Sequence, residues 1–209
     1  RNFITKLWNA ARFCEMNECR LESKFAPEAC DNAINRWIAS GCVEAARDVA
    51  AAIEAYRFNE AANTAYHFVW HTFCDWYLEF AKPVLYGDDG EAKDETRATA
   101  AWVLDRILAF MHPITPFVTE ELSGSLGWRG DTMMSDATWP AYDESLVDHE
   151  AKAEIDWLVR LIGEVRSVRA EMNVPPGAKV PLALADAGAD STTRFERNRT
   201  VIQTMARVE

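Results

Sequence analysis

Between Asn59 and Leu85, apolar residues recur with the period of an α-helix and cover most of its circumference. One face, with steps of three and four residues, holds Ala62, Tyr66, Val69, Phe73, Trp76 and Phe80. A second apolar sector beside it holds Trp70, Cys74, Tyr77, Leu78 and Ala81. Only a narrow strip is polar, so the pattern predicts a helix that is packed on several sides by other helices. We expect this helix to be the centre of a bundle, and we expect Pro83 to kink or end it.

Amphipathic patterns on both sides of this segment predict its partners. The first covers about residues 1–19, with a buried face of Phe3, Leu7, Ala10 and Cys14. A second begins after Asp31, the expected N-cap, and Gly41 inside it predicts a bend or a break. Further helices are predicted at about 93–111 and from Thr115 onward, followed by an irregular segment at 123–147. The predicted class is therefore all-α.

A second unit is predicted to begin near Asp148, so the expected domains are residues 1–147 and 148–209. Its first helix extends to about Met172 and buries Ile155, Leu158, Ile162 and Val165. Residues 180–185 have the pattern of a short strand, and a last helix covers roughly 191–206. Because a lone strand is not stable, this one is expected to pair with strands beyond Glu209 or to lie against the bundle. The second unit is thus predicted to be a helix–strand–helix extension.

Composition narrows the possible functions. A net charge of −11 argues against loose, sequence-independent binding to nucleic acid, which needs a basic face. Five cysteines without a C-x-x-C pair are typical of reduced, buried thiols in a cytoplasmic protein. There is neither an apolar run long enough to cross a bilayer nor a signal peptide, so no membrane partner is expected. Because a helical pattern is already under way at Arg1, we expect the chain to be a piece of a longer protein.

Two clusters have the spacing of chemical sites. His67, His71 and Cys74 lie on one side of the central helix and could supply three zinc ligands. No fourth ligand and no H-E-x-x-H pattern supports this, so packing is the favoured interpretation and no metal is predicted. Asp75 and Glu79 could act as an acid–base pair, but a solvated polar strip, or ion pairs with Arg57 and Lys82, is favoured. Nucleotide-binding and hydrolase motifs are absent, so neither a catalytic residue nor a cofactor is predicted.

The polar face of the first helix is the strongest remaining signal. Opposite its buried face lie Asn2, Lys6, Asn9, Phe13 and Asn17. An aromatic ring among amides and a lysine is typical of recognition of single-stranded nucleic acid, where rings stack on bases and polar groups reach base edges. The alternative is that another segment covers Phe13, and from the residues alone this is favoured because apolar surface is usually buried.

A second basic stripe lies on the first helix of the second unit. It consists of Arg160, Arg166 and Arg169. These side chains are candidates for contacts to a nucleic-acid backbone. The alternative is ion pairing with Glu164 and Glu171 along the same helix.

Four segments carry a resemblance to a known family. They are N-F-I-T-K-L-W-N-A-A-R-F (2–13), Y-H-F-V-W-H-T-F-C-D-W-Y-L-E-F-A-K-P-V-L (66–85), H-P-I-T-P-F-V-T-E-E-L (112–122) and R-A-E-M-N-V-P-P (169–176). Together they closely resemble the valyl-tRNA synthetases, and K-L-W-N-A-A-R-F favours these over their isoleucyl and leucyl relatives. The resemblance implies the helical anticodon-binding domain that follows the catalytic core of these class I enzymes.

The resemblance also implies a set of roles. In the family, the positions of Lys6 and Phe13 are implicated in holding the A and C of the valine anticodon. Their neighbours on the first helix, Asn2, Asn9, Arg12 and Asn17, complete the set of candidate anticodon contacts; these are inferred from helix geometry and not from the resemblance. Expected partners are the anticodon loop of tRNA(Val) and the catalytic core of the same polypeptide, in a monomeric cytoplasmic enzyme.

The chemistry of such an enzyme is expected to lie outside this chain. The family's catalytic motifs H-I-G-H and K-M-S-K-S are absent, so ATP and Mg²⁺ would bind only in the full-length enzyme. The alternatives are a helical protein–protein interaction scaffold, the corresponding domain of an isoleucyl or leucyl enzyme and, third, a metal-dependent bundle enzyme.

Overall fold

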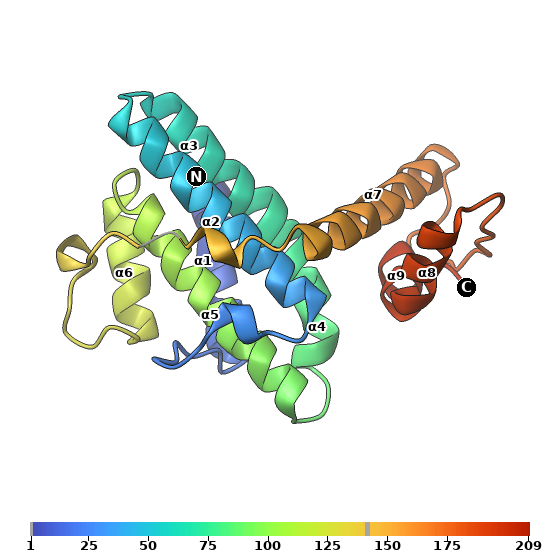
Figure 1. Ribbon diagram of the computed structural model, residues 1–209, viewed down its shortest axis with the longest axis horizontal. Helices are drawn as coiled ribbons and strands as arrows, with labels where there is room; N and C mark the ends of the chain where they lie inside the picture. Colours follow the sequence, from blue (N-terminus) through green and yellow to red (C-terminus); the bar gives the residue numbers. More distant parts are fainter. Residues whose placement is uncertain (1, 141–142) are drawn as a thin grey trace. The chain divides into compact units, whose positions relative to one another are not determined.

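The computed structural model describes residues 2–140 and 143–209, which form helices and loops (Figure 1). No strand occurs among these residues, so the predicted all-α class is confirmed. The chain divides into two compact units, Arg1–Asp148 and His149–Glu209, which we call unit 1 and unit 2.

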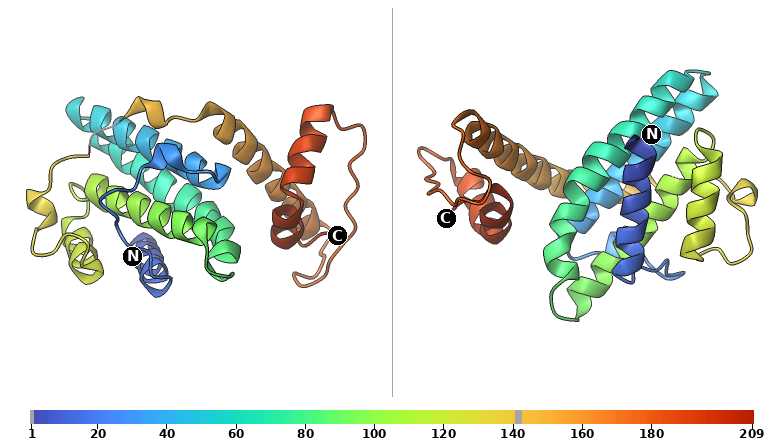
Figure 2. Two further views of the ribbon diagram at one scale, coloured as in Figure 1. Left: turned by 60° about the horizontal axis from the view of Figure 1, so that its bottom comes forward. Right: turned by 180° about the vertical axis from the view of Figure 1, so that it is seen from behind.

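Unit 1 is a bundle of packed helices joined by loops and short 3-10 turns. In chain order its longer elements are α1 (Asn2–Met16), α2 (Ala33–Glu54), α3 (Phe58–His67), the π-helix η2 (Phe68–Tyr77), α4 (Leu78–Leu85), α5 (Glu91–Met111) and α6 (Pro116–Leu126). The right-hand view of Figure 2 shows α1 on the outside of this bundle, between α6 and the long helix that continues from α3 into α4. One flank of α1 is therefore available to solvent.

The central helix predicted from the sequence is present, but it is not α-helical throughout. The chain continues from α3 through η2 into α4 without a break, and Pro83 lies inside its last turns. Before η2 the predicted buried face is wrong, because Ala61 and Ala65 are buried whereas Tyr66 is 37 % exposed. A π-helix joins residue i to i+5, so the buried stripe shifts where the chain passes through η2.

Local details of α2 also differ from the prediction. The N-cap is Asn32, whose side-chain oxygen accepts a hydrogen bond from the Ile34 N–H at 2.9 Å, and not Asp31. The predicted break at Gly41 is wrong, because α2 continues through it. A Cβ at Gly41 would lie 3.3 Å from the Phe68 ring, so the glycine allows α2 and η2 to pack closely.

A polar network crosses the otherwise apolar core of unit 1. The Tyr77 hydroxyl donates to the side-chain oxygen Oδ1 of Asn35 at 3.1 Å. The Asn35 amide donates in turn to Glu95 at 2.7 Å and to Thr96 at 3.3 Å. These bonds connect η2, α2 and α5, and they satisfy polar groups that would be costly to bury alone.

Unit 2 consists of α7 (His149–Glu171), α8 (Ala189–Arg197) and α9 (Arg199–Ala206). The predicted strand at 180–185 is wrong, because this extended segment makes only an isolated parallel bridge between Val180 and Val208. Its hydrogen bonds go to the last residues of the chain, with the Glu209 N–H donating to the Val180 carbonyl at 3.0 Å. Within unit 2 the segment therefore pairs with the residues that follow α9, and a single bridge is too short to count as a strand.

Candidate nucleic-acid interface

The two faces of α1 differ sharply in burial. Leu7, Ala10 and Cys14 are buried, which confirms most of the predicted core face. The opposite strip is the candidate interface. On it Asn2 and Asn9 are exposed, whereas Lys6, Phe13 and Asn17 are half-buried.

The Lys6 ammonium group lies between two side chains of η2. It forms an ion pair with Asp75, and it lies 3.9 Å from the centroid of the Trp70 ring, in the geometry of a cation–π contact. The Lys6 side chain remains 25 % exposed. Its charge is therefore held in a fixed place at the surface instead of moving freely in solvent.

Aromatic rings surround this lysine. The ring centroids of Phe3 in α1 and Tyr66 lie 5.3 Å apart, and the Tyr66 ring is stacked on that of Trp70 with centroids 5.6 Å apart. His71 lies beside Tyr66, and its Nδ1 atom is 3.4 Å from Asp75. The result is a partly exposed aromatic surface next to the α1 strip.

The apolar pattern does not predict the contacts of Trp70 and Asp75 with Lys6. It places Trp70 in an apolar sector and Asp75 in a solvated strip, because residues five apart point about 140° away from each other on an α-helix. In η2 the i to i+5 pattern brings such residues together. Unusual helical geometry of this kind carries no simple signal in the apolar pattern.

Phe13 is half-buried, so it is neither fully exposed for base stacking nor fully covered by another segment. Its ring contacts the edge of Tyr86, with centroids 6.3 Å apart and planes at 64°. Tyr86 is itself 67 % exposed, so it gives Phe13 only partial cover. The Phe13 ring thus contacts the exposed Tyr86 ring and keeps part of its own surface open.

Asn17 has a structural task at the end of α1. Its side-chain amide donates to the Phe13 carbonyl at 2.8 Å, and its own carbonyl accepts a hydrogen bond from the Arg97 guanidinium at 2.9 Å. Both contacts stabilise the end of the helix, which stops at Met16 and not at Cys19.

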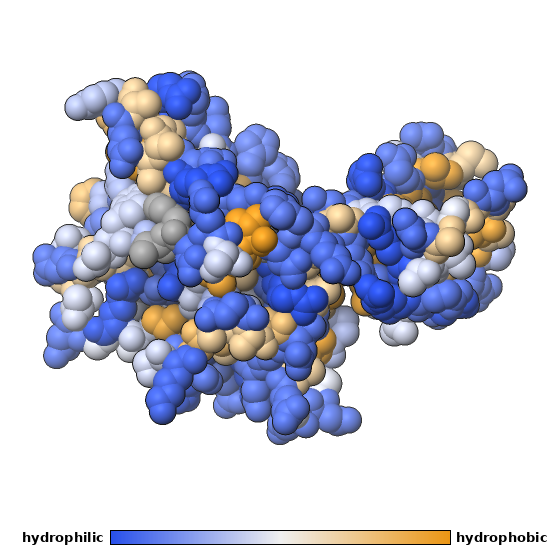
Figure 3. Space-filling view, viewed as in Figure 1, coloured by the Kyte–Doolittle hydropathy of each residue, from blue (hydrophilic) through white to orange (hydrophobic). Residues whose placement is uncertain are grey.

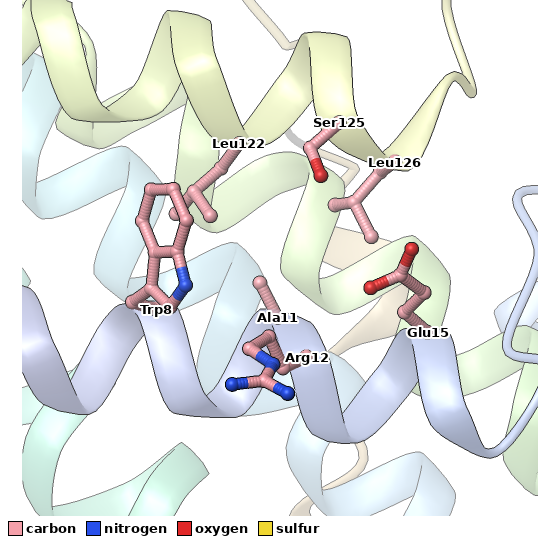
Figure 4. A pocket seen from close by; sticks show the side chains of 7 residues that line it. All are labelled: Trp8, Ala11, Arg12, Glu15, Leu122, Ser125 and Leu126. Carbon is pink, nitrogen blue, oxygen red and sulfur yellow. The ribbon is translucent and has the colours of Figure 1, made fainter.

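Arg12 belongs to a different surface from Lys6 and Phe13. Six residues after Lys6, it points about 120° away from it around the helix. It lines a groove of about 310 Å³ between α1 and α6, shown in Figure 4. The groove is lined by Trp8, Ala11, Arg12, Glu15, Leu122, Ser125 and Leu126.

The three side chains considered as zinc ligands, His67, His71 and Cys74, are not arranged as a metal site. The rings of His67 and His71 lie 5.4 Å apart, and Cys74 is buried. Burial raises the pKa of the Cys74 thiol to about 12, which disfavours the thiolate that a metal needs. Within residues 2–140 and 143–209, no group of three or more His, Cys, Asp or Glu side chains is arranged to hold a metal ion.

The three arginines of α7 have different surroundings within unit 2. Arg160 is exposed, and Arg166 donates from Nε to the Met205 carbonyl at 3.1 Å. Arg169 is buried, and its guanidinium donates to the carbonyls of Arg207, Ala178 and Pro175 at 3.0, 2.8 and 3.2 Å. Arg169 thus holds the loop after α7 and the end of the chain together, which leaves little of it for a phosphate.

The face of unit 1 turned away from α1, shown in Figure 3, is mainly hydrophilic with scattered apolar patches. Across the described residues, none of the helices has the length and apolar character needed to traverse a bilayer.

A helical bundle with an aromatic, amide-rich strip on one outer helix is suited to reading unpaired bases. Comparison with known families agrees: residues 35–184 match the anticodon-binding domain of tRNA ligases, and the chain belongs to this family. The matched range begins after α1, so the family match alone does not cover Lys6 and Phe13.

Individual relatives do cover α1. Over its whole length the chain is 51 % identical to a valine–tRNA ligase of Caulobacter vibrioides and 50 % identical to those of Brucella suis and Rhizobium meliloti. It spans only 23 %, 23 % and 22 % of these relatives' lengths, respectively.

Proposed function

We propose that this chain binds the anticodon loop of tRNA(Val) as one part of a longer valine–tRNA ligase. The observation that carries the proposal is the α1 strip, where a half-open aromatic ring and a fixed ammonium group lie on one face of an outer helix. Support comes from the family match and from relatives that are about half identical over the whole chain, α1 included.

The roles follow from the chemistry of the side chains. Phe13 offers a ring face on which a base can stack, and Lys6 offers N–H groups to a base edge. Both lie on the same side of α1, seven residues and therefore about 10 Å apart along its axis. Asn2 and Asn9 are exposed on the same strip and would extend the set of hydrogen-bonding groups.

Contacts to phosphates would come from other residues. Arg12, Arg160 and Arg166 are the candidates that have exposed side chains. Because only these three arginines are candidates and the net charge of the chain is −11, we expect its attraction to the nucleic-acid backbone to be weak. The proposed recognition therefore depends mainly on base stacking and base edges.

Ligation itself would take place in the remaining part of the polypeptide. Valine activation with ATP and Mg²⁺ is proposed for a catalytic core outside this chain, whose own sequence holds none of the motifs for it. We expect the whole enzyme to be a cytoplasmic monomer.

Titration of the chain with stem-loops that carry the valine or the isoleucine anticodon, at two salt concentrations, tests the proposal. We expect tighter binding to the valine stem-loop. We also expect a salt dependence well below that of six phosphate contacts, each of which lowers log K by roughly 0.7 per log unit of salt on single strands. Equal affinity for both stem-loops, or no binding to either, would contradict the proposed function.

A further inference from the structure

Lys6 has fewer free directions than an ordinary surface lysine. An ammonium group has three N–H donors. One is directed to the Asp75 carboxylate, and the face of the Trp70 ring occupies another side of the group. What remains open is a narrow sector toward solvent, on the strip that also carries Phe13.

The π-helix creates this arrangement. Trp70 and Asp75 are five residues apart, so on an α-helix they would diverge by about 140° and could not both face one lysine. Within η2 the hydrogen bonds join residue i to i+5, so the two side chains lie near each other on the side that faces α1. A stretch of π-helix is uncommon and is found frequently at functional sites.

The ion pair changes what Lys6 can recognise. An unpaired lysine is a point charge that attracts any phosphate, whatever the base sequence. The Asp75 carboxylate cancels most of that charge locally and would itself repel an approaching phosphate. A neutral acceptor atom on a base edge meets no such repulsion and can still use the open N–H group.

We propose that Asp75 is a specificity-determining residue for anticodon binding, which restricts Lys6 to acceptors on base edges by excluding phosphates. The inference rests on the proposed function. Many binding sites gain selectivity from a group that repels the wrong partner, and here the Asp75 carboxylate would repel phosphate. If the pair were only structural, it would stabilise α1 against η2 and leave selectivity unchanged.

Two variants of the whole chain separate these cases. Asp75→Asn removes the carboxylate beside Lys6. Glu79→Gln removes a carboxylate from α4 that pairs with Lys82 and has a similar side-chain exposure, 43 % against 41 % for Asp75. Both variants change the net charge by the same amount, so a difference between them reports the position of the charge and not its sum.

The readout is affinity for valine and isoleucine stem-loops over a range of salt. We expect Asp75→Asn to strengthen binding of the isoleucine stem-loop more than that of the valine stem-loop. Selectivity should fall by roughly two- to five-fold, within the energy of a part-exposed ion pair. The salt slope should steepen by about 0.7, equal to one new phosphate contact.

Glu79→Gln should change neither the selectivity between the two stem-loops nor the salt slope. In a Lys6→Ala background, Asp75→Asn should also lose its effect on both. Melting temperatures of all variants show that the fold is kept.

The inference is wrong if Asp75→Asn behaves like Glu79→Gln, or if it weakens both complexes equally with an unchanged salt slope. The proposed function fails by a separate outcome, in which the unmodified chain does not prefer the valine stem-loop. The two failures are therefore distinguishable in one set of titrations.

Discussion

Phe13 provides the most direct test of the α1 strip, because its ring can be removed at a modest cost to the fold. The contact that Phe13→Ala loses is an edge contact with Tyr86, worth about 0.5–1.5 kcal/mol beyond burial. Leu7 on the opposite face is fully buried, and Leu7→Ala should cost about 2–5 kcal/mol through the cavity it leaves. The two variants should therefore separate clearly in the free energy of unfolding.

Binding should show the reverse order. If an anticodon base stacks on the ring, Phe13→Ala loses about 1–3 kcal/mol, a roughly five- to 150-fold weaker complex. Phe13→Leu keeps an apolar contact with Tyr86 but offers no aromatic face, so it should bind almost as weakly as Phe13→Ala and be more stable. Lys6→Ala should weaken binding less than Phe13→Ala does, because it removes a hydrogen bond and not a stacked surface.

The assay is a pair of measurements on each variant: the unfolding free energy from urea titration, and the affinity for the valine stem-loop. If Phe13→Ala lowers the unfolding free energy as much as Leu7→Ala does, the Phe13 ring belongs to the core. Normal stability together with normal affinity would mean that the anticodon is held elsewhere. Both results would refute the reasoning about the strip, for different reasons.

Three further predictions concern stability. Arg169→Met keeps the length of the side chain but removes the donor to three carbonyls; we expect a loss of about 2–3 kcal/mol in unit 2 and faster hydrogen exchange at the Glu209 amide, which donates to the Val180 carbonyl. Asn35→Ala removes the nearer of two acceptors of the buried Tyr77 hydroxyl, which keeps only the Thr96 carbonyl at 3.4 Å, and it removes a donor to Glu95; it should cost about 1–3 kcal/mol in urea unfolding. Burial raises the pKa of the Cys42 thiol from 9.0 to about 12, so its contribution to stability is complete below pH 9 and is lost as pH rises toward 12. Urea midpoints measured from pH 7 to 11 should fall less steeply for Cys42→Ala than for the unmodified chain.

The regular helices were predictable because burial along them follows one period. Leu7, Ala10 and Cys14 on α1 are buried as expected, and so are Leu158 and Ile162 on α7. For such elements the apolar pattern alone identifies the core face, since each side chain's direction follows from its position in the sequence. The class of the fold followed from these elements.

In the central helix the apolar pattern predicts part of the buried face wrongly. A pattern extrapolated at one period across Phe68–Tyr77 puts Ala62 and Tyr66 in the core, whereas Ala61 and Ala65 are buried there. The choice between α- and π-geometry depends on how neighbouring helices pack, which a single segment does not encode.

The same limit explains the outcome at the candidate site. Phe13 stood out because it interrupts the polar face of a straight α-helix, and the role of Lys6 on that face was implied by the family resemblance. Asp75 did not, because its relation to Lys6 depends on η2 and on a contact between segments 69 residues apart in the sequence. Arg169 was grouped with its charged neighbours, since the carbonyls that it binds come from loops whose positions have no periodic signature.

The distribution of cations determines how this chain can combine affinity with selectivity. Lys6 is paired with Asp75, and Arg169 is used inside unit 2, so two of the positive charges predicted to face RNA contribute little to attraction at long range. A net charge of −11 weakens that attraction further. A surface of this kind gains little from any phosphate, so under the proposed function a stem-loop with another anticodon would bind only weakly. The consequence is weak binding by this chain alone, with most of the affinity for tRNA expected from the rest of the proposed ligase and most of the discrimination from the α1 strip.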